Sequence, residues 1–118
     1  TLLSGEIPHC TKGEQIWDYI YSKDAANALA RLAESGIDGK TYCLGSGKGI
    51  PLAEYIKTIR DTINPNLEIG FGDVPYGSQQ VMYLCADITE LTKDTGFMPQ
   101  IEFEEGIKNT IEWVKQLC

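Results

Sequence analysis

Apolar residues in this chain switch repeatedly between the two-residue spacing of a strand and the three-to-four-residue spacing of a helix. Residues 15–21 are rich in aromatic and β-branched side chains and predict a strand. A helical stripe follows at 23–34, with Ser22 as the predicted N-cap and Asp24 placed to complement the helix dipole. This alternation favours an α/β fold over an all-α or all-β one.

The rest of the chain continues the alternation. Pro51 suits the first position of a helix, and Gly96 stands where a left-handed helix end is expected. A length of 118 residues suits one hydrophobic core, so residues 1–118 are predicted to form a single unit. The expected fold is α/β, with few short strands and about four helices. Further strands are predicted at 41–44, 67–71 and 79–84, and helices at 51–63, 86–95 and 103–117.

The charge of the chain excludes several classes of partner. Its formal net charge is −7, its only arginines are Arg31 and Arg60, and its lysines are scattered. Nucleic acids and anionic membrane surfaces bind clustered basic residues, so neither is expected as a partner. No window approaches the roughly 20 apolar residues of a membrane span. Residues 1–10 do not form a signal peptide, and a beginning at Thr1 without Met suggests a piece of a longer protein.

The cysteines favour a reducing compartment. There is no Cys-x-x-Cys pair and His9 is the only histidine, so no metal site is expected. The even number of cysteines leaves disulfides open, but Cys43 and Cys85 lie in apolar, strand-like runs that suit buried thiols. We therefore predict reduced cysteines in a cytoplasmic protein. The four cysteines are Cys10, Cys43, Cys85 and Cys118.

No segment carries a recognisable catalytic or cofactor motif from its residues alone. The loop Gly45–Ile50 is glycine-rich, but it lacks the third glycine of a dinucleotide loop and the Gly-Lys-Ser/Thr end of a P-loop. A plain strand-to-helix turn is the favoured interpretation. His9 lies far from any serine-centred motif, so nucleophilic catalysis has no support. We predict no catalytic, cofactor-binding or metal-binding residue on this chain.

Aromatic side chains provide the candidate ligand contacts. Strand alternation places Trp17, Tyr19 and Tyr21 on one face, where they can belong to the core or stack on a ligand. Ligand contact is more plausible for Trp17 and for Tyr76 than for the others.

Four segments, in order, resemble the extended short-chain dehydrogenase/reductases that act on nucleotide sugars. Residues 17–26 resemble the family stretch Arg-Asp-aromatic-Ile-Tyr/His-Val-x-Asp-x-Ala. Residues 42–47 resemble its Tyr-Asn-Val/Leu-Gly-Ser/Thr-Gly. The other matching stretches are Pro51–Tyr55, Ala86–Thr89 with Gly96–Pro99, and Glu105–Trp113.

The resemblance implies a function for the parent protein. Members of this family are NAD(P)-dependent epimerases, dehydratases and 4-keto-reductases of nucleotide diphosphate-sugars. Their upstream Rossmann domain holds NAD or NADP and supplies a catalytic Tyr-x-x-x-Lys pair. By resemblance this chain is the small C-terminal substrate-binding lobe without the Rossmann domain, and catalytically silent alone. The alternative is a stand-alone binding or assembly module that has kept the lobe and lost catalysis.

Two departures from the family pattern concern the substrate diphosphate. Family members usually hold it with one arginine before the Asp-aromatic pair and another in the loop before Ala-Asp. Here those places hold Trp17 and, approximately, Tyr76 or Gly77. Neither Trp nor Tyr reproduces the bidentate contacts of arginine, so Lys12, Lys23 or the absent domain is expected to supply the positive charge.

We expect substrate recognition to depend on Trp17, Tyr76 and Gln80, through stacking and hydrogen bonding. The faces that pack on the absent Rossmann domain are expected to form an exposed apolar patch. The isolated chain is therefore predicted to self-associate.

Overall fold

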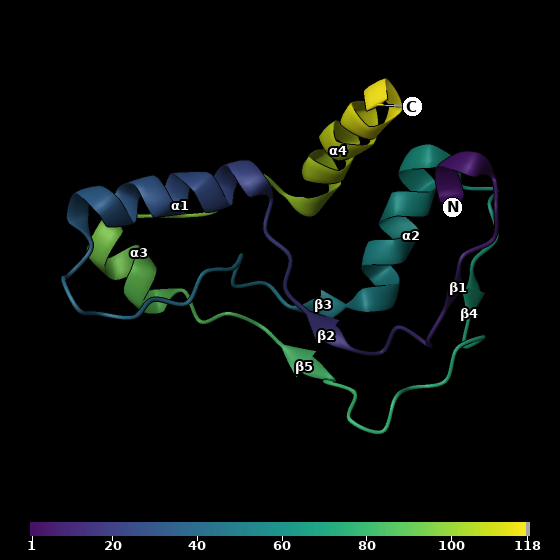
Figure 1. Ribbon diagram of the computed structural model, residues 1–118, viewed down its shortest axis with the longest axis horizontal. Helices are drawn as coiled ribbons and strands as arrows, with labels where there is room; N and C mark the ends of the chain where they lie inside the picture. The colour runs from purple at the N-terminus through teal and green to yellow at the C-terminus, as the bar shows by residue number, and fades with distance from the viewer. Residues whose placement is uncertain (118) are drawn as a thin grey trace.

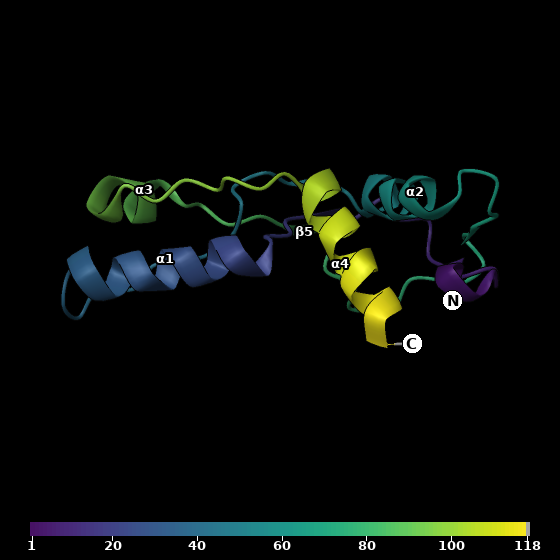
Figure 2. The same cartoon turned by 90° about the horizontal axis from the view of Figure 1, so that it is seen from above.

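The computed structural model describes residues 1–117, which form a flat and open plate (Figure 1). Its principal extents are 47 × 38 × 19 Å. The radius of gyration is 16.7 Å, whereas a compact domain of this length has one of about 13 Å. Helices α1 (Ser22–Ser35) and α3 (Thr89–Thr95) occupy one end of the plate. Helix α2 (Leu52–Ile63) lies toward the other end, and α4 (Phe103–Leu117) leans out of the plane (Figure 2).

The predicted α/β class, with a few short strands and four α-helices, is confirmed. Strand β2 lies between two neighbours, antiparallel to β3 and parallel to β5, and β1 pairs in parallel with β4. The elements are η1 (Leu2–Ser4), β1 (His9–Cys10), β2 (Ile16–Trp17), α1 (Ser22–Ser35), β3 (Ile50–Pro51), α2 (Leu52–Ile63), β4 (Gly70–Phe71), β5 (Tyr83–Leu84), α3 (Thr89–Thr95) and α4 (Phe103–Leu117).

The α1–α3 end of the plate has its own small core. Ala28, Leu91 and Phe97 are buried there, at 1% exposed or less. Ala28 comes from α1 and Leu91 from α3, and Gly96 ends α3 in the predicted left-handed conformation, with φ of 68°. Because a glycine pays no steric cost at positive φ, the chain can reverse there and direct Phe97 into the core.

The start of α1 differs from the sequence prediction. Ser22 is the first helical residue and does not cap the helix, since the N-cap is Tyr21 and no side chain caps it. Asp24 is 3% exposed and accepts hydrogen bonds from the N–H groups of Gln100 and Ile101 at 3.0 and 2.9 Å. Its carboxylate therefore ties the segment before α4 to α1, a role beyond the predicted effect on the helix dipole.

Helices α2 and α4 pack together through aromatic side chains. The Tyr55 ring meets Tyr19 edge-on at 4.9 Å and Phe103 at 4.5 Å between ring centroids. Its hydroxyl donates to the carbonyl oxygen of Trp17 at 3.0 Å, which satisfies the polar end of a residue that is 4% exposed. Tyr55 thereby fixes α2 against the end of β2.

The strands are shorter than predicted. Only residues 16–17 of the span 15–21 pair as a strand, and only 70–71 of the span 67–71. Residues 41–44 have no partner strand in the described part of the chain, so the predicted strand is absent there. Strand formation needs a neighbour in space, and this plate offers few.

The cysteine side chains agree only in part with the sequence predictions. Within residues 1–117, Cys10, Cys43 and Cys85 are free thiols, and Cys118 lies outside the described residues. Cys43 is exposed, contrary to its expected burial, because the strand predicted around it does not form.

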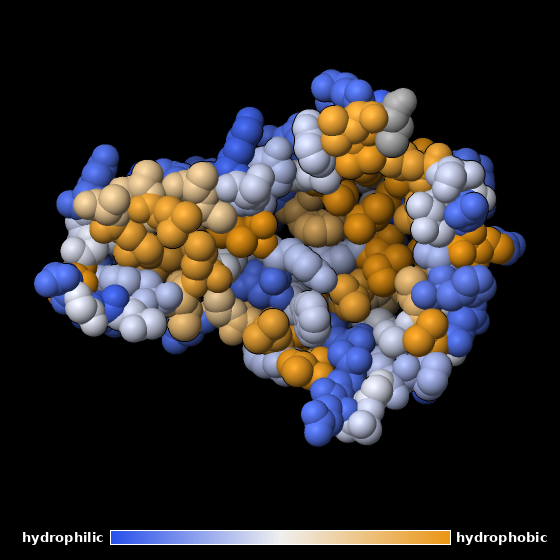
Figure 3. Space-filling view, in the orientation of Figure 1, coloured by the Kyte–Doolittle hydropathy of each residue, from blue (hydrophilic) through white to orange (hydrophobic). Residues whose placement is uncertain are grey.

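Apolar side chains cover much of one face of the plate (Figure 3), but self-association stays a prediction. Across residues 1–117, no helix has the length and apolar character needed to cross a membrane.

We expect Phe97→Ala to lower the free energy of unfolding by about 4 kcal/mol, because it leaves a cavity in a fully buried position. Urea unfolding followed by circular dichroism measures this change. Trp113→Ala is the control, since Trp113 is 59% exposed and its loss should cost less than about 1 kcal/mol. Equal losses would show that the α1–α3 core does not stabilise the chain.

Candidate functional site

The three predicted substrate residues lie along one seam, where residues 14–17 run beside residues 76–84. Parallel pairing of β2 with β5 joins Ile16 to Tyr83, and the Ile16 N–H donates to the carbonyl oxygen of Met82 at 2.9 Å. Trp17 ends β2, while Tyr76 and Gln80 belong to the loop that leads into β5. The fold therefore brings the three residues to one seam, although they are up to 63 positions apart in the sequence.

Hydrogen bonds along the seam hold these side chains in place. The Tyr76 hydroxyl donates to the Glu14 carboxylate at 3.0 Å and accepts from the Glu14 N–H at 3.1 Å. The Trp17 indole N–H and the Gln80 side-chain amide both donate to the carbonyl oxygen of Val81 at 3.4 Å. The loop is thus tied to the strand at two points, and substrate contact by Trp17, Tyr76 and Gln80 stays a prediction.

The most extensively hydrogen-bonded carboxylate near the seam is that of Asp18, next to Trp17. Its two oxygens accept from the N–H groups of Ser46 and Gly47 at 2.9 Å each, and from the N–H of Ala86 at 3.2 Å. The Ser46 hydroxyl and the Cys85 thiol also donate to it. One side chain therefore joins the end of β2, the glycine-rich loop and the chain after β5.

This arrangement explains the glycine-rich loop. Its N–H groups, which in other proteins bind phosphate, are directed at the chain's own carboxylate, so the favoured interpretation as a structural turn agrees with the geometry. A β-carbon at Gly45 would come within 2.5 Å of the Ala86 side chain and 2.7 Å of an Asp18 oxygen. Gly45 is therefore required for the loop to approach Asp18 closely.

Side chains with catalytic potential are not assembled in the described residues. A Tyr-x-x-x-Lys spacing does occur at Tyr19 and Lys23, but Tyr19 lies before α1 and Lys23 lies inside it. The two therefore do not share one helix face, as residues four apart on a helix do. The His9 ring is hydrogen-bonded to the Asp73 carboxylate at 2.7 Å, and both side chains are exposed. No group of three or more metal-binding side chains occurs among residues 1–117.

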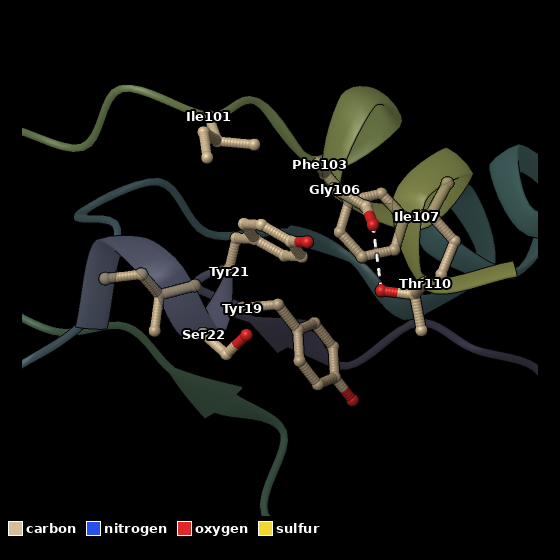
Figure 4. Close-up of a pocket in the computed structure, with 9 residues that line it drawn as sticks. Tyr19, Tyr21, Ser22, Ile101, Phe103, Gly106, Ile107 and Thr110 are labelled. Atoms are coloured by element: carbon tan, nitrogen blue, oxygen red, sulfur yellow. Dashed lines mark hydrogen bonds between the residues drawn. The ribbon is translucent and has the colours of Figure 1, made fainter. Parts of the chain in front are cut away.

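A pocket of about 230 Å³ opens between the start of α1 and α4 (Figure 4). Tyr19 and Tyr21 line it, and so does Thr110, whose hydroxyl donates to the Gly106 carbonyl oxygen at 2.8 Å within α4. A second pocket of about 150 Å³ shares Tyr19 and Phe103 with the first. The lining residues of the first pocket are Tyr19, Ile20, Tyr21, Ser22, Ile101, Phe103, Gly106, Ile107 and Thr110.

The sequence indicated these pocket residues only in part. The strand-like alternation placed Tyr19 and Tyr21 on one face, and both do line the pocket. Gly106 was not singled out, although its β-carbon would lie 3.0 Å from the Tyr21 ring. A glycine within an otherwise strong helical pattern was the available signal, because such a residue often marks a close approach.

The Cys85 thiol and the Tyr55 hydroxyl, which lie near Asp18, both have a raised pKa. Burial, followed by the negative charge of Asp18, raises the pKa of the Cys85 thiol. Burial also raises the pKa of the Tyr55 hydroxyl, so it remains a proton donor. Both groups are neutral hydrogen-bond donors at neutral pH.

We expect Asp18→Ala to lower the free energy of unfolding by about 3 kcal/mol, because several donors lose a charged acceptor. Urea titration measures the loss. Asp38→Ala removes an equal charge from an exposed position and should change stability by less than about 0.5 kcal/mol. If the two variants unfold alike, Asp18 does not organise the loop.

The raised pKa of Cys85 predicts slow alkylation, because the thiolate is the reacting form. At pH 8, iodoacetamide should modify exposed Cys43 about tenfold faster than Cys85. Peptide mass spectrometry after timed quenching gives both rates. Asp18→Asn should speed the reaction at Cys85 and leave the rate at Cys43 unchanged. A faster reaction at Cys85 in the unmodified chain would contradict the assignment.

This chain is similar to known proteins both in sequence and in fold. No family model matches the chain. The chain is 30% identical to dTDP-glucose 4,6-dehydratase 1 of Escherichia coli K12, over 91% of its own length and 31% of the enzyme's. It superposes on UDP-glucose 4-epimerase of Thermotoga maritima, solved with UDP-glucose, with a TM-score of 0.89 and 26% identity. That match covers 98% of the chain and 37% of the epimerase.

A third match is the Bordetella bronchiseptica enzyme WbmF in complex with NADH, with a TM-score of 0.82 and 26% identity. It covers 98% of the chain and 34% of WbmF. The chain thus spans about a third of the length of the proteins it matches, at their C-terminal part. In sequence and in fold, this chain matches the C-terminal part of the extended short-chain dehydrogenase/reductase family of nucleotide-sugar epimerases and dehydratases.

Proposed function

We propose that this chain is the substrate-binding part of an NAD(P)-dependent nucleotide-sugar epimerase, dehydratase or 4-keto-reductase. The observation that carries the proposal is the match of more than nine-tenths of the chain to the C-terminal third of enzymes named for dTDP-glucose and UDP-glucose. The remaining two thirds of such an enzyme would precede Thr1 and would hold the cofactor, as the complex of WbmF with NADH suggests.

The geometry favours a part of an enzyme over a stand-alone binding module. The two pockets lined by Tyr19, of about 230 and 150 Å³, are smaller than the sites of about 300–1,000 Å³ that usually enclose ligands. Larger hollows of about 440 and 390 Å³ have none of the predicted substrate residues in their lining. The plate is also more open than a compact domain of its length, with a radius of gyration of 16.7 Å against about 13 Å. A site for a molecule as large as a nucleotide sugar would therefore need a second wall from another part of the protein.

The role proposed for this chain is to hold and orient the substrate. The Trp17 indole can stack on a base or sugar, and the side chains of Tyr76 and Gln80 can hydrogen-bond to its hydroxyl groups. Tyr76 is already positioned by Glu14, so its orientation is set before binding. Lys12 lies at the entrance to the same loop, where its side chain approaches Gly72, and could meet the diphosphate. Hydride and proton transfer would belong to the cofactor-binding part, which leaves this chain catalytically silent alone.

Replacing both Trp17 and Tyr76 with alanine in the complete enzyme should weaken nucleotide-sugar binding at least about tenfold, because stacking and a positioned hydroxyl are lost together. Isothermal titration with dTDP-glucose and UDP-glucose measures the affinity. Gln80→Ala should give a smaller loss of affinity.

Trp113→Ala is the control for this experiment, since it removes an exposed tryptophan from α4, away from the seam. Its affinity should equal that of the unmodified enzyme. Unchanged affinity in the folded double variant would remove Trp17 and Tyr76 from the site. A complete enzyme that binds no nucleotide sugar at all would contradict the proposed function.

A further inference from the structure

A nucleotide diphosphate-sugar carries negative charge that the three candidate substrate residues do not match. Trp17, Tyr76 and Gln80 are uncharged, and the chain as a whole has a formal net charge of −7. A diphosphate that is taken out of water without a facing cation loses hydration and gains no ion pair in return. Binding of such a substrate at the seam is therefore favoured by a positive side chain close to these residues.

Several basic side chains are already paired on the helices, away from the seam. The Lys40 ammonium group binds two carboxylates of α3. Lys23 lies within α1, and the Lys12 side chain approaches Gly72, whereas Lys48 belongs to the glycine-rich loop. The pairs within α2 and α4 are Lys57–Glu54, Arg60–Asp61 and Lys108–Glu104.

Lys48 lies beside Trp17, although the two residues are distant in the sequence. The Tyr55 hydroxyl oxygen is 3.0 Å from the carbonyl oxygen of Trp17 and 3.4 Å from that of Lys48. Antiparallel pairing of β2 with β3 joins Trp17 to Ile50, two residues after Lys48. The Lys48 N–H donates to the Ser46 hydroxyl at 3.1 Å, which fixes the backbone of the loop at this point. The fold therefore presents Lys48 at the end of the seam.

The Lys48 ammonium group already binds an anionic oxygen. Its Nζ lies 2.6 Å from Oε1 of Glu102, and both residues line the pocket of about 150 Å³ together with Tyr19 and Ser46. The two charged side chains are 67% and 74% exposed, and ion pairs as exposed as this one contribute little to stability. The Glu102 carboxylate is thus a weakly held anion that a more highly charged one can displace.

A diphosphate suits this lysine better than a single carboxylate does. It presents more charge on more oxygens, and the lysine ammonium group offers three donors on a flexible four-carbon chain. The Trp17 ring lies 6.3 Å from the ring of Tyr19, which lines the same pocket as Lys48. A substrate that stacks on Trp17 therefore has its diphosphate near the Lys48 ammonium group.

We propose that Lys48 binds the diphosphate of the substrate, and that Glu102 holds the lysine in place until the substrate displaces it. The inference rests on the proposed function, because it concerns a nucleotide-sugar substrate. It goes further by naming the residue of this chain that supplies the positive charge and the residue that competes with the substrate for it.

Affinity measurements on the complete enzyme test the proposal, with UDP-glucose and dTDP-glucose as probes. Lys48→Met removes the charge but keeps a long unbranched side chain, and it should weaken binding about tenfold. Lys48→Arg keeps the charge and should retain the affinity within about threefold. Isothermal titration measures each affinity, and circular dichroism verifies that each variant is folded.

Lys57→Met is the matched control, because Lys57 is also an exposed lysine paired with a glutamate, and its loss should leave the affinity unchanged. An unchanged affinity in the folded Lys48→Met variant would overturn the proposal. So would an equal loss of affinity in Lys57→Met.

Glu102→Gln separates a binding role of Lys48 from a purely structural one. If the Glu102 carboxylate competes with the substrate, its removal should raise the affinity about threefold, because Lys48 no longer has to leave a charged partner. A lysine that serves only to hold the segment before α4 gives no such gain. Glu104→Gln removes an equal charge from another exposed ion pair and should leave the affinity unchanged. A gain no larger than that of the control would contradict the exchange.

Inorganic pyrophosphate, which lacks the base and the sugar, distinguishes this inference from the proposed function. It should bind the complete enzyme about tenfold more weakly after Lys48→Met. Nucleotide sugars that bind equally well with and without Lys48 would refute the inference and keep the function. Pyrophosphate binding through Lys48 in an enzyme that binds neither nucleotide sugar would support the lysine site and refute the function. A folded enzyme that binds none of the three probes would overturn both.

Discussion

The hydrogen bonds to the Asp18 carboxylate are the interaction on which the arrangement of this chain most depends. They join three segments that come from distant parts of the sequence, and each donor is a group that would otherwise need its own partner. Asp18 stands between Trp17, at the end of the seam, and Tyr19, in the wall of both pockets. Both candidate regions are therefore positioned by the same carboxylate.

Charged hydrogen bonds are suited to this chain because its apolar core is small. A plate about 19 Å thick holds little more than one or two layers of helices, whose diameter with side chains is about 10–12 Å. Burial of apolar side chains is correspondingly limited. Asp18 and Asp24 each bind at least two backbone N–H groups, and such bonds are stronger than those between neutral groups. They connect segments that a larger core would otherwise hold.

The helices could be predicted from the sequence because their signals are local. Apolar spacing and helix-end residues lie within each segment, and α4 begins and ends at the predicted Phe103 and Leu117. Strands depend on partners elsewhere, so their predicted spans were too long, and the one at 41–44 does not form within this chain. The role of Asp18 was missed for a related reason. Its donors lie 28 or more positions away, and no local spacing reveals such a contact.

The sequence indicates which residues belong to the candidate site but not how they are arranged. Residue type and resemblance indicate Trp17, Tyr76 and Gln80 as substrate contacts, and the fold brings these residues onto one seam. Their mutual arrangement depends on the pairing of β2 with β5, which the sequence alone did not specify. Neither of the two pockets lined by Tyr19 is large enough to enclose a nucleotide sugar. In the proposed enzyme, the site is therefore completed only when the N-terminal part covers the plate, so that cofactor and substrate meet at the boundary.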